Sequence, residues 1–296
     1  MSILVVQLLN ALLYAAILFL IAGGLSLIYG VMRIVNLAHG SLYAVGAYVM
    51  AWLVGGLAAR LPALALLAVL PLAAAAVAAV GALVEPAFLR PLYRRAEEYQ
   101  LLMTFGLLLL LEDLMRFVWG PTPLSATALW SSFSPVTVLG APYPTYNLLV
   151  ILIGLVAAAL LWAFVYRTRF GVLLRATSQD MRMAAALGID VRRVYLQAFV
   201  LGCFMAGLAG AVIVPIQGAV LGMGVEALIL AFVAVVIGGL GSLEGALVGA
   251  VIVGLVRTAA IQYVPELELA ILYLIAAVVL ITRPSGLFGT REARRA

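Results

Sequence analysis

The chain has 296 residues, of which 67% are hydrophobic and 10% are charged, and its formal net charge is +5. Water-soluble domains carry about 25% charged residues, and a soluble fold of this length exposes too much surface to hide so much apolar material. The composition therefore excludes a soluble globular protein and indicates an integral membrane protein.

Apolar runs of about 18 residues or more recur along the chain, and each is long enough to cross roughly 30 Å of hydrocarbon as a helix. The first run has neither a basic leader nor a clear small-residue cleavage site, so we expect a retained helix. We predict an all-α integral membrane protein, a polytopic bundle of about eight to nine transmembrane helices in a single domain, residues 1–296. The predicted spans are 7–31, 35–56, 62–84, 100–118, 146–166, 194–217, 225–241, 243–260 and 269–282.

Polar residues interrupt this pattern where the second span begins, in the stretch MRIVNLAHG, residues 32–40. Asn36 and His39 stand there, and ionisable residues inside a membrane are costly enough that a functional role is the default hypothesis. His39 has three possible roles: lining a transport path, bonding across helices to hold the bundle, or carrying a proton. The cross-helix bond is favoured, because proton carriers usually contain a relay of several buried ionisable groups.

The loops between spans differ in charge, and this difference predicts the topology. Fourteen of the 17 arginines lie at Arg33, in 85–98, in 167–193 and after 282. The positive-inside rule places these segments in the cytoplasm, including a C-terminal tail, 283–296. Residues 119–145 contain no charge but many Pro, Ser and Thr and two Trp, which is typical of an external loop. The N-terminus is then expected outside.

The cytoplasmic loop 167–193 contains the pattern of a short helix. Its start signal is Thr177 with Asp180, or Ser178 as an alternative N-cap, which puts Asp180 in the first turn. Gly188 is a natural stop, so the helix has about ten residues and a length of roughly 15 Å, too short to span. Its predicted small, smooth face consists of Met181, Ala184, Ala185 and Gly188. The alternatives are a solvated loop with incidental helicity and a docking element for a soluble partner, which the small side chains favour.

The region 225–260 is harder to divide into spans. The sequence GGLGSLEG interrupts its apolar run, as either a tight cytoplasmic turn or a broken helix. Gly241, Gly245 and Gly249 are spaced by four residues, which predicts close helix packing rather than a site. Glu226 opens the seventh span on the external side. Glu226 has two possible roles: it contacts substrate or a binding protein, or it simply interacts favourably with the helix dipole. The helix-dipole role is favoured.

Several functions are excluded by residues that the chain lacks. All of its basic residues are arginine, so it has no P-loop of the GxxxxGK[ST] type and no Schiff-base lysine. One cysteine, Cys203, and one histidine rule out an internal disulfide and an ordinary Cys/His metal site. We therefore expect no enzyme activity and no cofactor in this chain, and ATP with Mg²⁺ on partner subunits if ATP is used. The positive charge follows membrane topology, so no nucleic-acid partner is expected.

Several segments of the sequence resemble a known family of membrane transport proteins. The segment ATSQDMRMAAALGID resembles the cytoplasmic coupling motif of ABC-importer permeases. The blocks GGLSLIYGVMRIVNLAHGSLYAVGAYV, VRRVYLQAFVLGCFMAGLAGAVIVPIQG, VVIGGLGSLEGALVGAVIVGLV and RPSGLFG are similar to the permeases of branched-chain amino-acid importers, in the order of that family. The resemblance implies that the coupling residues are Asp180, Arg182, Ala184, Ala185, Gly188 and Asp190.

The resemblance also implies partners and a location. These are two cytoplasmic ABC ATPase subunits, a second related permease subunit in a heterodimer rather than a homodimer, and a periplasmic or extracellular substrate-binding protein. The chain would lie in the lipid bilayer of a bacterial or archaeal inner membrane. ATP-driven closure of the ATPases would push on residues 178–190 and produce alternating access.

Two positions depart from the family pattern. The family often has an acidic residue after its His-Gly pair, where this chain has Ser41, and Asp180 precedes the alanines by four positions. Ser41 therefore joins Asn36, His39 and Glu226 as a candidate for the pathway or for holding helices. A permease for urea or short-chain amides has similar blocks, and an ion-driven secondary transporter and a membrane-embedded enzyme are weaker alternatives.

Overall fold

The computed structural model describes residues 2–57, 61–93 and 95–289. Arg60, Arg94 and residues 290–296 of the predicted cytoplasmic tail therefore lie outside the described residues. About 80% of the described chain is helical, and it contains one two-stranded antiparallel hairpin in which Val136 stands opposite Tyr143. The fold class predicted from the sequence is confirmed.

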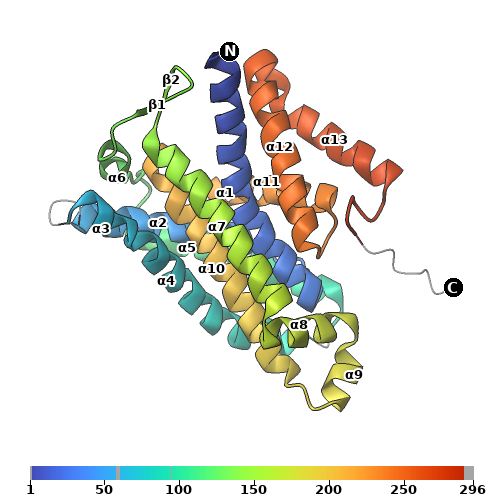
Figure 1. The fold of residues 1–296 in the computed structure, drawn as a ribbon. Coiled ribbons are helices and arrows are strands. Elements are labelled where there is room, and N and C mark those ends of the chain that lie inside the picture. The colour runs from blue at the N-terminus through green and yellow to red at the C-terminus, as the bar shows by residue number, and fades with distance from the viewer. Residues whose placement is uncertain (1, 58–60, 94, 290–296) are drawn as a thin grey trace.

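The elements follow one another as a series of long helices with short connections (Figure 1). In chain order they are α1 (Ser2–Met32), α2 (His39–Leu57), α3 (Ala63–Leu67), α4 (Val69–Val84), a π-helical turn η1 (Glu85–Leu89), a 3₁₀ turn η2 (Arg90–Leu92), α5 (Glu97–Trp119), α6 (Thr127–Ser131), β1 (Val136–Val138), β2 (Ala141–Tyr143), α7 (Thr145–Arg167), α8 (Arg169–Gln179), α9 (Met181–Ala186), α10 (Val191–Gln217), α11 (Met223–Gly238), α12 (Leu243–Tyr263), η3 (Pro265–Leu267) and α13 (Glu268–Thr282).

Seven helical segments of the described chain are long and apolar enough to cross a membrane. They are Ile3–Met32, His39–Leu57, Leu64–Leu92, Thr145–Arg167, Val191–Gln217, Leu243–Tyr263 and Pro265–Thr282. The predicted spans 100–118 and 225–241 correspond to α5 and α11. Helix α5 carries Glu112, Asp113 and Arg116, and α11 has 16 residues. The ambiguity in 225–260 is resolved as two helices joined by a tight turn, in which Gly239 and Gly241 have φ of 112° and 80°.

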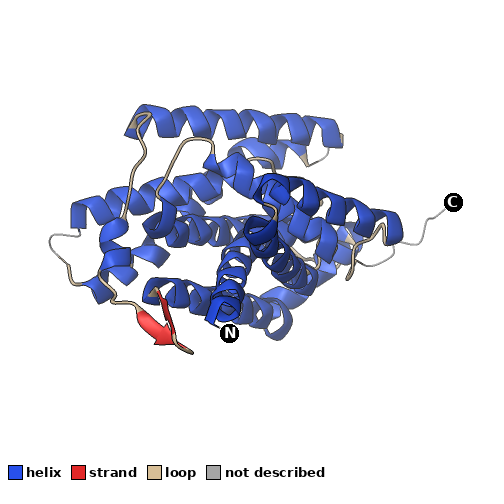
Figure 2. Ribbon diagram, turned by 90° about the horizontal axis from the view of Figure 1, so that it is seen from above, coloured by secondary structure: helices blue, strands red, loops and turns tan. Residues whose placement is uncertain are grey.

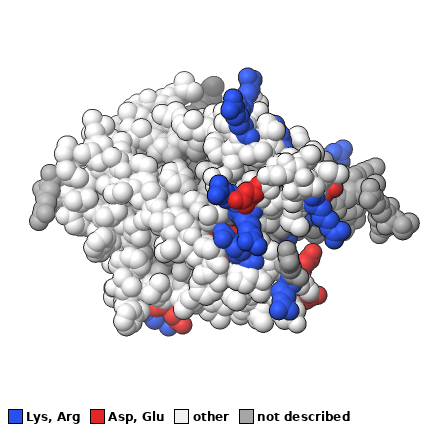
Figure 3. Space-filling view, turned by 90° about the horizontal axis from the view of Figure 1, so that it is seen from below, with Lys and Arg blue, Asp and Glu red and all other residues white. Residues whose placement is uncertain are grey.

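The two ends of the bundle differ in character. Helices α8 and α9 lie at one end, and the β1–β2 hairpin, α6 and the N-terminus lie at the other (Figure 1). In the view from above, the hairpin lies near the N-terminus (Figure 2). In the view from below, charged side chains gather over one part of the face and leave most of it uncharged (Figure 3). Exposed arginines of the α8–α9 region are Arg167, Arg169, Arg182, Arg192 and Arg193. The segments 119–145 and 167–193 therefore lie at opposite ends, as the charge pattern predicts; which end faces the cytoplasm stays a prediction.

Small residues bring the central helices close together. Helix α10 packs against α1, α2 and α4, and α12 packs against α1 and α11. A Cβ atom added at Gly46 of α2 would collide with the backbone of Gly207 in α10, and one added at Gly249 would collide with the carbonyl of Ala234. Gly245 and Gly249 thus serve helix packing, as the sequence predicts, whereas Gly241 lies in the turn between α11 and α12 and approaches Gly30 of α1.

The connection between α1 and α2 is a non-helical segment, residues 33–38, in which Ile34, Asn36 and Ala38 are buried and Arg33 is exposed. The predicted span 35–56 is helical only from His39. Arg33, directly after α1, has a φ of 55°. The Thr104 hydroxyl of α5 donates a hydrogen bond to the Val35 carbonyl at 3.3 Å. This bond partly replaces the backbone pairing that a helix would have provided.

Candidate functional site

The segment predicted to couple to a partner forms two helices rather than one. Asp180 has extended backbone angles, φ −148° and ψ 99°, which end α8, and its carboxylate caps α9 by accepting hydrogen bonds from the backbone N–H groups of Arg182 and Met183, both at 2.9 Å. The expectation that Thr177 or Ser178 caps a ten-residue helix is wrong. Both residues lie in the last turns of α8, where their hydroxyls donate to carbonyls of that helix. Asp180 is an N-cap because its short carboxylate reaches two unpaired N–H groups at once.

Helix α9 has six residues and presents a surface different from the predicted one. Ala184 is 2% exposed and packs inward, so the small face of Met181, Ala184, Ala185 and Gly188 is not presented as a unit. The α9 surface, as we call it below, consists of the exposed residues Arg182, Met183, Ala185, Leu187 and Gly188. Met183 and Leu187 are 58% and 75% exposed. Gly188 ends the helix with φ 83°, which confirms the predicted stop.

Asp190 begins the next helix in the same way that Asp180 begins α9. Its carboxylate accepts a hydrogen bond from the Arg193 backbone N–H at 3.2 Å and pairs with the Arg193 side chain at 2.9 Å. The two acidic residues of the coupling segment therefore fix the directions of α9 and α10. Both carboxylates have hydrogen-bond partners within this chain, so a contact with another subunit is not needed to explain them.

A chain of polar and aromatic contacts leads from α9 into the bundle. The Tyr195 hydroxyl of α10 donates to the Met181 sulfur at 3.2 Å, and the Tyr195 ring meets Tyr93 edge-on at 5.1 Å between centroids. The Tyr93 hydroxyl donates to the carboxylate of Glu85, which is fully buried and also pairs with Arg90 at 2.7 Å. Burial, with the Glu85 hydrogen bond second, raises the pKa of Tyr93 above its ordinary value. Sequence reasoning missed this cluster; the signal was a glutamate at the end of an apolar run, five residues before an arginine.

The polar residues at the start of α2 hold three helices together. His39 is fully buried and its Nε2–H donates to the Ile21 carbonyl of α1 at 3.1 Å. Asn36 Oδ1 accepts from the Ala38 N–H at 3.2 Å, and Ser41 Oγ donates to the Leu108 carbonyl of α5 at 3.3 Å. Of the three roles considered for His39, this geometry matches the cross-helix bond. Asn36 Nδ2 and His39 Nδ1 have no hydrogen-bond partner among the described residues.

Glu226 lies apart from that group, in the first turn of α11. Its carboxylate is 3.6 Å from the guanidinium of Arg257 in α12, whose Nε also donates to Glu268 of α13 at 2.6 Å. The guanidinium also lies 4.8 Å from the centroid of the Tyr14 ring in α1. The sequence analysis did not select Arg257, although an arginine inside an apolar span and away from the arginine-rich loops was a usable signal.

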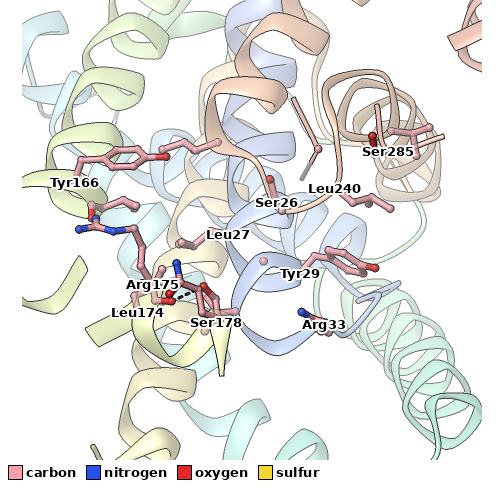
Figure 4. A pocket seen from close by; sticks show the side chains of 18 of the residues that line it. Ser26, Leu27, Tyr29, Arg33, Tyr166, Leu174, Arg175, Ser178, Leu240 and Ser285 are labelled. Atoms are coloured by element: carbon pink, nitrogen blue, oxygen red, sulfur yellow. Dashed lines mark hydrogen bonds between the residues drawn. The ribbon is translucent and has the colours of Figure 1, made fainter. Parts of the chain in front are cut away.

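A large cavity opens at the end of the bundle that carries α8. It has a volume of about 650 Å³ and lies between α1, α7, α8, α11 and α12 (Figure 4). Arg33 and Arg175 line it together with hydroxyl groups from Ser26, Tyr29 and Ser178. The Arg175 guanidinium lies 5.3 Å from the Tyr166 ring centroid. A polar cavity at one end of an apolar bundle is suited to solutes entering or leaving water.

Comparisons with known proteins give matches to one kind of protein, and these matches extend over nearly the whole chain. Residues 7–281 match the model of a family described as the permease component of branched-chain amino acid transport systems. The chain is 28% identical over 291 residues to the high-affinity branched-chain amino acid transport system permease protein LivH of Escherichia coli K12, covering 93% of this chain and 92% of that protein.

Two further relatives come from another bacterium and from an archaeon. The high-affinity branched-chain amino acid transport system permease protein BraD of Pseudomonas aeruginosa is 27% identical over 298 residues, 98% of this chain and 97% of the relative. A probable branched-chain amino acid transport permease protein LivH of the archaeon Methanocaldococcus jannaschii is 30% identical over 256 residues, 83% of this chain and 78% of the relative.

Proposed function

The chain belongs to the family of permease components of branched-chain amino acid transport systems, and we propose that it is the membrane-spanning permease subunit of an ATP-driven importer for leucine, isoleucine or valine. The observation that carries this proposal is the match of residues 7–281 to the family. The protein is a multi-pass protein of the cell membrane, in agreement with its seven candidate spans among the described residues. Relatives in bacteria and in an archaeon agree with a prokaryotic inner membrane.

ATP hydrolysis is assigned to other subunits in this proposal. The absence of lysine from the sequence leaves no phosphate-binding loop of the lysine-containing type, so ATP and Mg²⁺ would be held by two cytoplasmic ATPase subunits and this chain would carry out no catalysis. Those subunits would dock on the α9 surface. A short helix with exposed Met183 and Leu187 fits the hydrophobic groove of a partner.

Coupling would be mechanical. Closure of the ATPases would displace α9, and the contact between Met181 and Tyr195 would carry that displacement to α10. Helix α10 packs on α1, α2 and α4, so its motion would rock the centre of the bundle and open the pathway at alternate ends. The cavity of about 650 Å³ beside α8 would be the exit toward the ATPase side.

Two further partners complete the proposal. A second, related permease subunit would form the other half of the pathway, as a heterodimer. A substrate-binding protein would deliver the amino acid at the end opposite α9, where the uncharged 119–145 loop and its hairpin lie. No nucleic acid is involved.

The proposal is tested by gentle affinity purification of this chain from its native membranes, with identification of the co-purifying proteins by mass spectrometry. Two P-loop ATPases and a second permease are expected. Recovery of the chain alone, together with transport driven by an ion gradient, would contradict the proposal. Uptake measured in reconstituted vesicles then identifies the substrate: leucine, isoleucine and valine should compete with one another, whereas urea or acetamide as the stronger competitor would reassign the importer to amides.

A further inference from the structure

Three ionisable side chains, Glu226, Arg257 and Glu268, meet on helices α11, α12 and α13. Arg257 is 14 residues beyond Leu243, the first residue of α12, which corresponds to roughly 21 Å along a helix. The hydrocarbon core of a bilayer is about 30 Å thick, and Leu243 lines the cavity beside α8. Arg257 therefore lies about two-thirds of the way to the opposite end, together with Glu226 and Glu268.

Charges at this depth do not face lipid. Ionisable residues in transmembrane segments face the interior, another subunit or a water-filled cavity, because hydrocarbon does not solvate them. The Glu226 side chain is 67% exposed in the isolated chain, whereas Arg257 is 20% exposed. The surface around Glu226 must therefore be a water-filled path or be covered by another subunit.

A cavity of about 110 Å³ lies directly beside these charges. Glu226, Arg257, Tyr14, Tyr43 of α2 and Gln217 supply polar groups to its lining. The rest of the lining is largely apolar and comes from α1, α10, α11 and α12; it includes Ile17, Ile21, Leu230 and Val253. The cavity is smaller than the 300–1,000 Å³ that is typical of sites for drug-sized ligands, and it suits a small solute with one charged end and one apolar end.

The two carboxylates hold Arg257 with unequal strength. Glu268 accepts a hydrogen bond from Arg257 Nε at 2.6 Å, whereas Glu226 lies 3.6 Å from Nη2, which is beyond hydrogen-bond distance. The Tyr14 ring packs against the guanidinium at 4.8 Å and contributes a cation–π attraction. Glu268 and Tyr14 thus fix the orientation of the guanidinium, and the Glu226 pair is free to open.

We propose that Arg257 and Glu226 form a binding site for the zwitterionic head of an amino acid, with the amino acid's apolar side chain in the 110 Å³ cavity. The inference rests on the proposed function and names the residues that select its substrate. The substrate carboxylate replaces Glu226 at Arg257, with the paired geometry that guanidinium groups favour. Glu226 then accepts hydrogen bonds from the substrate ammonium.

A zwitterion adds one positive and one negative charge, so the net charge of the site does not change and each charged group keeps an oppositely charged partner while the amino acid passes. This matters because an unpaired charge in a low-dielectric layer is strongly unfavourable. The apolar wall distinguishes leucine, isoleucine and valine from polar amino acids. Urea and short amides lack both charges and would leave Glu226 and Arg257 paired with each other.

The test uses the purified complex in lipid nanodiscs, without the substrate-binding protein. Ala227 lines the cavity and carries no charge, so Ala227→Cys places a thiol there without disturbing the ion pairs. The chain's own cysteine, Cys203, is fully buried, which keeps background labelling by a small methanethiosulfonate reagent low. Leu267→Cys is the matched control, because Leu267 is 52% exposed and outside the cavity.

We expect leucine to slow labelling at Ala227→Cys and not at Leu267→Cys. 4-Methylpentanoate, which lacks the ammonium, and 3-methylbutylamine, which lacks the carboxylate, should not slow it. Adding Arg257→Gln to Ala227→Cys should raise the leucine concentration needed for protection at least about tenfold, since a hydrogen bond to a charged group is lost.

The site is rejected if leucine protects neither cysteine, protects both equally, or protects no better than 4-methylpentanoate. A different measurement tests the proposed function. If the unsubstituted complex with its binding protein shows no ATP-dependent leucine uptake in vesicles from the same preparation, the proposed function is rejected. Uptake without protection at Ala227→Cys therefore rejects the site alone.

Discussion

The Tyr195 hydroxyl donates a hydrogen bond to the sulfur of Met181 at 3.2 Å, and this contact joins α10 to the six-residue helix α9. It is one of few direct links between α9 and the core, because α9 packs only lightly on α10. Tyr195 is buried and its ring also meets Tyr93. A displacement of α9 therefore reaches the π-helical turn at the end of α4 as well as α10.

Tyr195→Phe tests this connection, because it removes the hydroxyl and keeps the ring contact with Tyr93. We expect normal assembly with the ATPases but about a twofold or greater fall in leucine transported per ATP hydrolysed, since the lost interaction is one modest hydrogen bond. Transport and ATPase activity are measured together in vesicles. Tyr263→Phe, at a residue that is 78% exposed, is the control; an unchanged ratio for Tyr195→Phe would remove Tyr195 from the coupling route.

Leu187→Asp tests the α9 surface. Leu187 is 75% exposed, so a charge there should leave the fold intact while it disrupts an apolar contact with a partner. We expect the amount of co-purifying ATPase to fall at least about tenfold, as for the loss of a central interface residue. Leu267→Asp at the far end should have no such effect. Equal ATPase recovery from both variants would place docking elsewhere.

Glu85→Ala tests the buried cluster at the end of α4. The substitution leaves Arg90 without its bidentate partner and Tyr93 without its acceptor. Breaking a buried ion pair costs about 3–5 kcal/mol, and we expect about 2–3 kcal/mol here because Arg90 is 34% exposed. Thermal unfolding of the purified protein in detergent measures the loss. Glu98→Ala, at an exposed residue, should change the midpoint little, and a similar effect at both sites would contradict the assignment.

His39→Gln separates the structural role of His39 from proton transfer. Glutamine keeps a donor that can reach the Ile21 carbonyl but does not titrate. We expect a loss of stability of about 1 kcal/mol or less and an unchanged dependence of leucine uptake on pH between about 5 and 8. A flattened pH profile in the variant would instead support a proton-carrying His39.

The sequence was informative about features that depend on composition and local backbone geometry. The span limits follow hydropathy, Gly188 ends α9 because its φ of 83° favours glycine, and Gly245 and Gly249 lie where α12 packs on α11. The start of α9 was not predictable with the same certainty. Thr177, Ser178 and Asp180 are all good N-caps, and packing of α8 against α7 and α10 extends that helix through the first two.

Features that depend on distant partners could not be read from the sequence. Ala184 turns inward because α9 rests on the bundle, and a helical pattern of six residues does not reveal which side is covered. Arg257 meets Glu226 and Glu268, which lie 31 residues before it and 11 residues after it, on two different helices. Local reasoning therefore assigned Glu226 to a helix-dipole role and left its partner unnamed.

The glycine contact between α2 and α10 restricts how the protein can move. Gly46 and Gly207 touch backbone to backbone, and Gly207 also meets Val77 and Ala74 of α4. No flexible side chain separates the three helices at this point, so they cannot slide or tilt against one another without steric collision. They form a single rigid block, and the hinge of the transport cycle must lie at its margins, where longer side chains leave room to re-pack.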